Sequence, residues 1–268
     1  MSALLPVMAT NLAISAAFFA ALWLISLRLK DPSFIDAWWA LGVIVLSWST
    51  FAQLEAPGPH ATALTLLSTA WALRLGVYLI WRWRKNGPDR RYEKLAQRAR
   101  DKHKLNFALF SLLWVFAPQL FLQFVTALPA QLGQLGDNEA IGAIGAFGLW
   151  LAVIGIVYEA IADAQLSHFK SVAANAGKVM DQGLWRYSRH PNYLGELVTW
   201  WGLYLIALDA GFGVQALAGP LLLTYLLTRV SGAPTTEGHL QRTRPEYEAY
   251  KARTSSFIPL PPKQTPRL

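Results

Sequence analysis

Seven long apolar stretches run through this chain, and they restrict its fold more than any other feature. The stretches are Pro6–Leu27, Ala37–Leu54, Ala61–Ile80, Leu105–Leu128, Ala140–Ala162, Tyr193–Leu208 and Phe212–Arg229. A helix that crosses a bilayer needs about 20 mostly apolar residues. Because 54% of the 268 residues are hydrophobic and only 15% are charged, the chain is too apolar for an ordinary soluble domain. The sequence therefore predicts an all-α polytopic membrane protein with seven transmembrane helices.

The positive charges alternate between the two ends of these stretches. Apart from Arg74, every Lys and Arg follows the first, third, fifth or seventh stretch, counting Arg229 at the end of the seventh. By the positive-inside rule, the N-terminus is expected outside and the C-terminus in the cytoplasm. The net charge of +8 is thus explained by topology, and nucleic-acid binding is not expected. No basic segment or Ala-x-Ala exit accompanies the first stretch, so we expect a retained span rather than a cleaved signal.

The rest of the composition favours one domain without a metal site. No linker, repeat or low-complexity segment interrupts the chain, so residues 1–268 are expected to form a single membrane domain. Residues 235–268 are expected to be a cytoplasmic tail that folds over the inner face. The chain has no cysteine, and its five histidines contain no His-x-x-x-His pair. These absences exclude disulfides and thiolate ligands and give no metal-binding motif.

Polar side chains crowd the start of the sixth stretch, in Gly183-Leu-Trp-Arg-Tyr-Ser-Arg-His-Pro-Asn-Tyr-Leu-Gly-Glu196. His190 precedes a proline, which disfavours helix there. A purely structural interpretation is therefore a loop followed by a helix that Asn192 caps. That interpretation leaves Glu196 unexplained, because an ionisable group at membrane depth is costly and usually faces a cavity or a partner. We therefore expect a ligand here. The candidate ligand-binding residues are Arg189, His190, Asn192 and Glu196.

Two basic residues of the third stretch and its following connection are further candidates. Arg74 and Tyr78 share a helical face between Trp71 and Trp81. Arg74 could extend toward the cytoplasm or face a cavity, and we favour the cavity. Arg91 is suited to clamp phosphate, since a guanidinium group binds it bidentately. The alternative is that this basic connection lies against anionic lipid headgroups, and composition does not separate the two.

The fifth stretch continues as a helix that carries Glu159, Asp163 and Lys170 on one face. Acids at this spacing are ordinary on a solvated surface, but at the inner membrane boundary they favour a site for hydroxyl groups.

The predicted topology brings six polar residues to the cytoplasmic face. They are Arg74, Asp163, Lys170, Asn192, Glu196 and His239. A cleft there offers cations for phosphate, acids for ribose hydroxyls, and an amide with a carboxylate for a carboxamide. This set suits NADPH, whose chemistry the cofactor itself carries. Because no Gly-x-Gly-x-x-Gly joins a strand to a helix, the site is not expected to be of the Rossmann type.

Three motifs of the chain resemble the bacterial branch of the steroid 5α-reductase family. They are the run Gly183–Glu196, the preceding Asp163-x-Gln-x-x-x-Phe-Lys170, and the closing Arg-Pro-Glu-Tyr…Arg-Thr-Ser-Ser-Phe-Ile-Pro. The resemblance covers most of the chain and is strongest from about Gly148 to Pro262. It implies a seven-helix fold in the bacterial cytoplasmic membrane, NADPH on the cytoplasmic side, and hydride transfer to the β-carbon of a steroid or enone lipid.

Carried over by position, the resemblance also implies roles for single residues. Asn192 and Glu196 would hold the nicotinamide end. Asp163 and His239 would serve the ribose and adenosine parts.

The substrate end departs from the family pattern. The resemblance assigns Lys170 and Arg74 to the phosphates, and it expects a tyrosine and a glutamate that hydrogen-bond the substrate carbonyl. Trp71 stands where that tyrosine belongs, and an indole cannot protonate an enolate. Tyr78, two helical turns further on, and Glu55 are the catalytic candidates that replace the family pair.

Two other functions compete with the reductase. Arg-His-Pro-x-Tyr-x-Gly followed by Glu also resembles the isoprenylcysteine carboxyl methyltransferases, which bind S-adenosylmethionine. The Asp163 to Lys170 element favours the reductase. A non-catalytic small-molecule-binding membrane protein would need a continuous polar path, and the outer connections hold few polar groups. Membrane lipid is an expected partner, whereas no protein partner is inferred.

Overall fold

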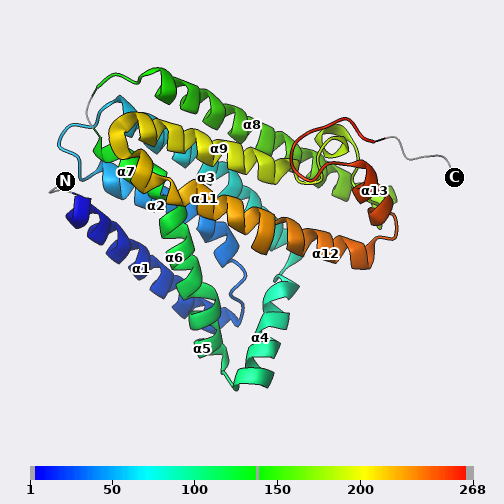
Figure 1. The fold of residues 1–268 in the computed structure, drawn as a ribbon. Coiled ribbons are helices and arrows are strands. Elements are labelled where there is room, and N and C mark those ends of the chain that lie inside the picture. The colour runs from blue at the N-terminus through cyan, green and yellow to red at the C-terminus, as the bar shows by residue number, and fades with distance from the viewer. Residues whose placement is uncertain (1–3, 137–138, 264–268) are drawn as a thin grey trace. The chain divides into compact units, whose positions relative to one another are not determined.

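The chain folds into helices throughout the part that the structure describes. The computed structural model describes residues 4–136 and 139–263, apart from the side chains of Asn86 and Arg90. The α-helices are α1 (Leu4–Leu29), α2 (Ile35–Phe51), α3 (Pro59–Asn86), α4 (Arg90–His103), α5 (Phe107–Ser111), α6 (Ala117–Thr126), α7 (Leu128–Leu132), α8 (Ala143–Ser171), α9 (Pro191–Ala207), α10 (Gly213–Ala216), α11 (Ala218–Tyr225), α12 (Ala233–Thr243) and α13 (Tyr247–Arg253) (Figure 1). No strand occurs within these described ranges. The predicted all-α class is confirmed.

Five helical segments are long and apolar enough to cross a membrane. They are Leu4–Leu29, Pro59–Lys85, Phe107–Thr126, Ala143–Ser171 and Pro191–Ala216. The other two predicted spans are less regular. The second predicted span is the apolar helix α2, which has only 17 residues. The seventh is divided into α10, α11 and the π-helical turn Leu226–Val230.

The break before the seventh predicted span has a local cause. Gly211 has φ 90°, a left-handed conformation in which a side chain would be strained. The chain therefore turns at Gly211 instead of continuing the helix that begins at Pro191.

The helices form two compact units. Unit 1 comprises residues 1–146 and 203–219, and unit 2 comprises residues 147–202 and 220–268, of which the described residues are discussed below. The sequence predicted one domain. Each unit has long-range packing of its own.

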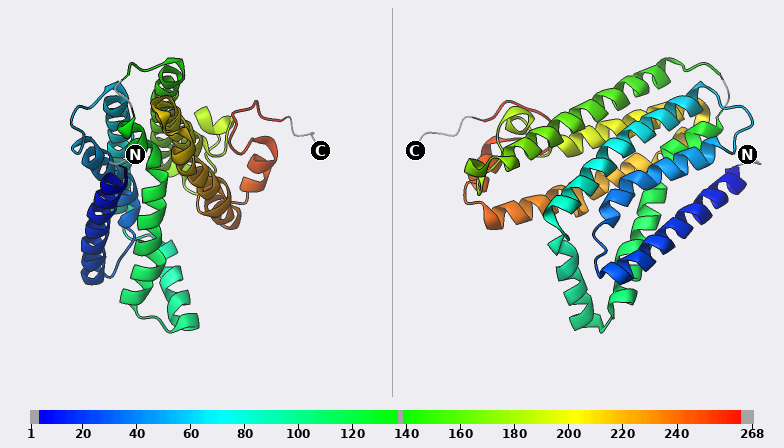
Figure 2. Two further views of the ribbon diagram at one scale, coloured as in Figure 1. Left: turned by 60° about the vertical axis from the view of Figure 1, so that its left-hand side comes forward. Right: turned by 180° about the vertical axis from the view of Figure 1, so that it is seen from behind.

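In unit 1, α2 and α3 form the best-packed pair, and the two views of Figure 2 show them side by side. Leu46 of α2 and Leu64 and Trp71 of α3 are fully buried. Gln123 of α6 lies against Gly42, where an added Cβ would be 2.4 Å from its Nε2. The same Nε2 donates to the carbonyl oxygens of two α2 residues at 2.9 Å. A buried amide thus joins α6 to α2.

Polar contacts also tie distant parts of unit 1. The Asn11 amide nitrogen donates to Thr50 Oγ1 at 2.7 Å and to Gln131 Oε1 at 3.0 Å, and all three residues are buried. His60 Nε2 lies 2.8 Å from Asp209 Oδ2. These contacts satisfy groups that would be costly to leave unpaired in an apolar environment.

In unit 2, small residues bring α8 and α9 into close contact along their length (Figure 1). A Cβ added to Gly155 would lie 2.4 Å from the Thr199 nitrogen, and one added to Gly195 would lie 2.6 Å from the Glu159 nitrogen. At Gly202 the nearest atom, the Ala152 nitrogen, would be 2.5 Å away. Close backbone approach through glycine is typical of helix pairs in membranes.

Candidate functional site

The close α8–α9 pair brings two predicted site residues together in unit 2. Asn192 Nδ2 donates to Asp163 Oδ1 at 3.2 Å. Asp163 is 5% exposed, whereas Asn192 is half-buried. Asn192 is the second residue of α9, which begins at Pro191, where the missing amide hydrogen of proline costs the helix nothing. The loop before α9 therefore sets the residue at which α9 begins, and with it the position of Asn192 opposite α8.

Two further acids lie one turn from this pair. Glu159 precedes Asp163 by four residues on α8, and Glu196 follows Asn192 by four on α9. They are only 2% and 7% exposed. Since Gly195 has no side chain, the backbone of α9 approaches Glu159 closely. Three carboxylates and one amide are therefore concentrated on two touching helices.

One atom of this group is poised to accept a hydrogen bond. The side-chain oxygen of Asn192, Oδ1, is buried and has no hydrogen-bond partner among the described residues. A buried acceptor without a donor costs about 1–3 kcal/mol, so a ligand N–H or O–H would relieve that cost. This requirement fits the amide nitrogen of a carboxamide.

Arg189 and His190 have a different arrangement from the one that the sequence predicted. Glu237 Oε1 accepts from Arg189 Nε at 3.0 Å and lies 2.8 Å from His190 Nε2. The side chain of Arg189 is 12% exposed, that of His190 2% and that of Glu237 14%. Both cationic candidates are thus directed at a protein carboxylate that belongs to α12.

The segment after α13 completes the surroundings of Arg189. Its Nη1 donates to the carbonyl oxygens of Thr254 at 2.6 Å and Lys251 at 3.2 Å. The backbone nitrogens of Arg189 and His190 donate to the carbonyl oxygens of Ser255 and Ser256. The tail therefore folds over the loop before α9. Residues 264–268 of the predicted tail lie outside the described residues.

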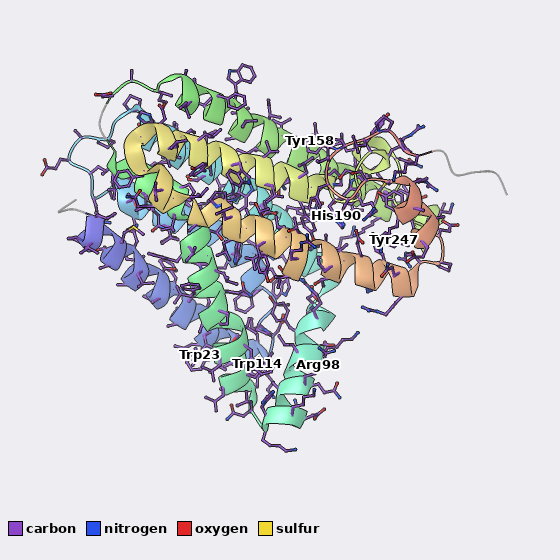
Figure 3. All side chains as sticks on the ribbon, viewed as in Figure 1. Trp23, Arg98, Trp114, Tyr158, His190 and Tyr247 are labelled. Atoms are coloured by element: carbon purple, nitrogen blue, oxygen red, sulfur yellow. The ribbon has the colours of Figure 1, made fainter. Side chains whose placement is uncertain are left out.

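The charge states of Glu237 and Tyr247 depend on their neighbours. Burial raises the pKa of Glu237, but its hydrogen bond with His190 and the Arg189 guanidinium outweigh burial and lower the pKa to about 2. Burial raises the pKa of Tyr247, and the neighbouring Glu237 carboxylate raises it further. Figure 3 shows His190 and Tyr247 near one another in unit 2. At neutral pH, Glu237 is an anion and Tyr247 is a neutral phenol.

Lys170 and His239 are exposed on the surface of unit 2. Lys170 lies near the end of α8, seven residues beyond Asp163 and therefore about 10 Å along the axis. His239 lies on α12, two residues after Glu237. Their positions are open to a soluble ligand, and neither belongs to the buried acid and amide group.

The remaining predicted residues belong to unit 1. Arg74 and Tyr78 lie on α3, where the Tyr78 ring stacks on Trp81 with centroids 6.1 Å apart. Glu55 is exposed in the turn before α3, whose start at Pro59 is 19 residues, about 28 Å, from Tyr78. Glu55 and Tyr78 therefore lie at opposite ends of one helix and cannot act on the same carbonyl.

Arg91 is engaged within unit 1. Its Nη2 lies 2.9 Å from Asp36 Oδ2 and 2.8 Å from Asp89 Oδ2. These two carboxylates compete with any phosphate for the guanidinium group.

The sequence did not predict a role for Glu237. It lies 47 residues beyond His190, two residues before the predicted His239. The available signal was electrostatic: adjacent Arg and His residues entering an apolar segment need an anion, but three acids in the tail could have supplied it.

Comparisons with known proteins show which family the chain belongs to. A family model described as "Protein of unknown function (DUF1295)" matches residues 22–254. The chain is 25% identical over 268 residues to "Uncharacterized protein C594.04c" of Schizosaccharomyces pombe, a match that covers 89% of this chain and 75% of the fungal protein. No solved structure matches.

Proposed function

We propose that this chain, which belongs to the DUF1295 family and whose Gly183–Glu196 run resembles the steroid 5α-reductase family, is a membrane-embedded NADPH-dependent reductase. Its reaction is hydride transfer to the C=C bond of an enone lipid or steroid-like substrate. The observation that carries the proposal is the buried Asp163–Asn192 pair with the unpartnered Asn192 oxygen.

Asn192 is suited to recognise the carboxamide of a nicotinamide ring. Its Nδ2 is directed to Asp163 at 3.2 Å, which leaves Oδ1 as the acceptor for the ligand amide. This arrangement fixes the orientation of the Asn192 amide, since an exchanged oxygen and nitrogen would set two oxygens against each other. Glu196, one turn deeper and 7% exposed, adds a carboxylate that binds the same end of the cofactor. When bound, NADPH supplies the hydride.

The other end of the cofactor needs groups that solvent reaches. Asp163 is the acid for a ribose hydroxyl, while the solvent-exposed Lys170 and His239 are assigned to the phosphate and adenosine parts. Arg189 and His190 act through Glu237: they hold the loop that sets the position of Asn192. In this proposal they are positioning residues rather than phosphate ligands.

Of the two catalytic candidates, both in unit 1, Tyr78 stays a prediction for the residue that contacts the substrate carbonyl. A phenol hydroxyl can donate to a carbonyl oxygen and stabilise the charge that develops on it during hydride transfer. Tyr78 is half-buried. Glu55, at the far end of α3, is not assigned a role.

The membrane setting completes the proposal. We assign seven crossings, counting α2 and the divided segment after Gly211, with the N-terminus outside and the cofactor site facing the cytoplasm of a bacterial cell. The alternation of Lys and Arg along the chain supports this orientation.

One observation favours a second function, an S-adenosylmethionine-dependent methyltransferase. Glu159, Asp163 and Glu196 are three buried acids on α8 and α9. Carboxylates grouped in this way suit the positively charged sulfonium of S-adenosylmethionine.

Ligand-induced thermal stabilisation of the full chain, purified in detergent, separates the two functions. A ligand at 100 times its Kd stabilises the folded state by about 2.7 kcal/mol. We expect NADPH to raise the Tm more than NADH does, and S-adenosylmethionine to have little effect. The opposite ranking would assign the site to the methyltransferase. NADPH oxidation with a panel of enone lipids and steroids then identifies the substrate.

A further inference from the structure

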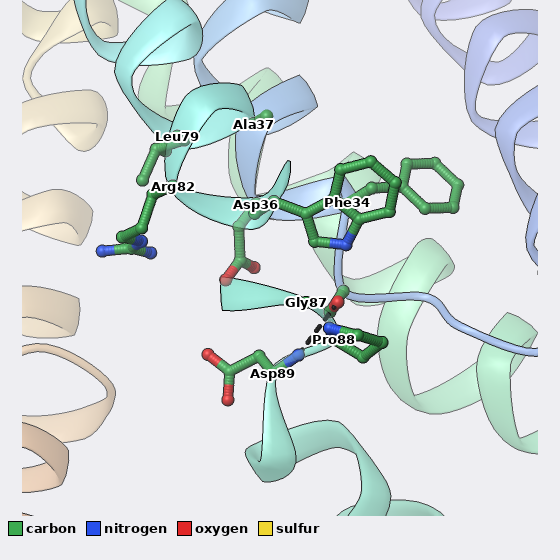
Figure 4. A pocket seen from close by; sticks show the side chains of 10 residues that line it. Phe34, Asp36, Ala37, Leu79, Arg82, Gly87, Pro88 and Asp89 are labelled. Atoms are coloured by element: carbon green, nitrogen blue, oxygen red, sulfur yellow. Dashed lines mark hydrogen bonds between the residues drawn. The ribbon is translucent and has the colours of Figure 1, made fainter. Parts of the chain in front are cut away.

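A cavity of about 420 Å³ opens in unit 1 between the start of α2 and the end of α3. Its volume falls within the range of about 300–1,000 Å³ that is common for small-molecule sites. Phe34 and Trp83 line it with aromatic rings, and Asp36, Arg82 and Asp89 line it with charges (Figure 4). None of these five residues belongs to the proposed reductase site.

Two carboxylates on one side of the cavity are held in place by a single guanidinium group. Arg91 Nη2 lies 2.9 Å from Asp36 Oδ2 and 2.8 Å from Asp89 Oδ2. Tyr92 donates its hydroxyl hydrogen to Asp36 Oδ1 at 2.5 Å. Burial raises the pKa of Asp89, but its hydrogen bonds and ion pair with Arg91 outweigh burial and lower it, so Asp89 is ionised at neutral pH.

Arg82 is the cation of the cavity that no carboxylate contacts directly. Within the described part of the chain it makes no hydrogen bond or ion pair; its charge acts on Asp36 and Asp89 at longer range, and its guanidinium lies 6.0 Å from the Tyr78 ring centroid. An anion would complete its coordination. A simple anion, however, would also face Asp36 and Asp89. A simple cation would be repelled by Arg82. A ligand that carries both a negative and a positive group can place the negative group at Arg82 and the positive group at the two carboxylates.

The position of the cavity indicates where such a ligand comes from. The apolar segment of α3 that is long enough to cross a membrane ends at Lys85, which assigns Arg82 and Trp83 to the end of the span. Trp81 and Trp83 are typical of that interface, and Lys85 lies 5.1 Å from the Trp81 ring centroid. Phe34 and Trp83 form an edge-to-face pair with centroids 6.4 Å apart, which offers an aromatic surface to a cationic headgroup.

We propose that this cavity binds a phosphoethanolamine group, carried by phosphatidylethanolamine of the surrounding membrane. The phosphate contacts Arg82, and the ammonium donates hydrogen bonds to the outer lone pairs of Asp36 and Asp89. A primary ammonium meets this geometry, whereas the quaternary ammonium of choline has no hydrogen to donate. The site is independent of the reductase reaction and does not require it.

The test measures thermal stability of the full chain in detergent micelles, supplemented with phosphatidylethanolamine, phosphatidylcholine or phosphatidylglycerol. We expect phosphatidylethanolamine to raise the Tm of the wild type by about 3–5 °C more than either other lipid does. Arg82→Gln and Asp89→Asn should abolish that difference; asparagine also preserves the helix cap that Asp89 supplies to α4. The matched control is Arg84→Gln, an exposed arginine two residues along α3, which should retain it.

Every outcome bears on the proposal. Equal stabilisation by the three lipids, or selectivity for phosphatidylglycerol or phosphatidylcholine, overturns it, and so does selectivity that survives in Arg82→Gln. If Arg82→Gln fails to fold, Asp89→Asn carries the test: selectivity that survives in Asp89→Asn overturns the proposal, and its loss there, with retention in Arg84→Gln, supports it. Soluble glycerophosphoethanolamine is the second arm. If this compound stabilises the protein as much as the lipid does, the headgroup chemistry is supported. The ligand is then a free phosphoethanolamine ester, and the lipid source is overturned.

Discussion

His190 and Glu237 lie 47 residues apart in the chain, yet His190 Nε2 and Glu237 Oε1 are 2.8 Å apart in the structure. The same oxygen accepts from Arg189 at 3.0 Å. This contact joins the loop before α9 to α12, and the loop in turn starts the helix that carries Asn192 and Glu196. Glu237, which lies outside the candidate ligand-binding group, therefore anchors the loop that leads into that group.

The first prediction concerns the stability that Glu237 provides. Glu237→Gln keeps the size of the side chain but removes the charge that faces the buried Arg189. We expect a loss of about 1–3 kcal/mol in the free energy of unfolding, measured by denaturant titration in detergent. Glu248→Gln, an exposed acid of α13, is the control and should change little. Equal effects of the two substitutions would mean that the Arg189–Glu237 contact adds no stability.

The second prediction is the pH dependence of that contribution. The pKa of Glu237 is lowered from 4.5 to about 2 in the folded protein, because the His190 hydrogen bond and the Arg189 charge outweigh burial. The folded state therefore binds fewer protons on this group than the unfolded state does. The stabilisation is complete above pH 4.5 and is lost as the pH falls toward 2. The difference in Tm between the wild type and Glu237→Gln should shrink over that interval, and a constant difference would contradict the assignment.

The third prediction tests the proposed nicotinamide site. Glu196→Gln should weaken NADPH binding about tenfold, which corresponds to about 1.4 kcal/mol, while the Tm of the ligand-free protein stays close to that of the wild type. Isothermal titration calorimetry of the purified protein measures the affinity. Unchanged affinity would reassign Glu196 to helix packing. The control for the loss of one acid is Glu248→Gln, a substitution at an exposed position.

The fourth prediction concerns the close α8–α9 contact. Gly195→Ala adds a Cβ that would lie 2.6 Å from the Glu159 nitrogen, a backbone atom that cannot rotate away. We expect a loss of about 1–3 kcal/mol in stability and weaker NADPH binding, because the helices must separate beside Asp163 and Asn192. Gly238→Ala on α12 is the control. Its Cβ would meet only the flexible Arg242 side chain at 3.7 Å, so higher helix propensity should leave stability equal or greater. Similar losses in both variants would remove the argument for close packing.

The sequence alone determined that the chain is helical and membrane-embedded. Apolar runs of bilayer length and the alternation of positive charge are local properties, and a helix satisfies its backbone hydrogen bonds within one segment. The same reasoning identified Asn192, Asp163 and Glu196 as polar groups too costly to bury without a purpose. It could not show that α2 has only 17 residues or that the chain turns at Gly211, because apolar length does not reveal where a helix stops.

The tertiary structure decided which polar groups meet. Asn192 contacts Asp163 across 29 positions, and Arg91 contacts Asp36 across 55. Composition offered several acids for each cation, and the choice depends on helix packing that glycines such as Gly195 permit. Arg189 and His190 were therefore expected to bind a ligand, whereas the fold directs them at Glu237. Periodicity along a helix fixes which face a side chain occupies, but only packing between distant segments fixes what that face meets.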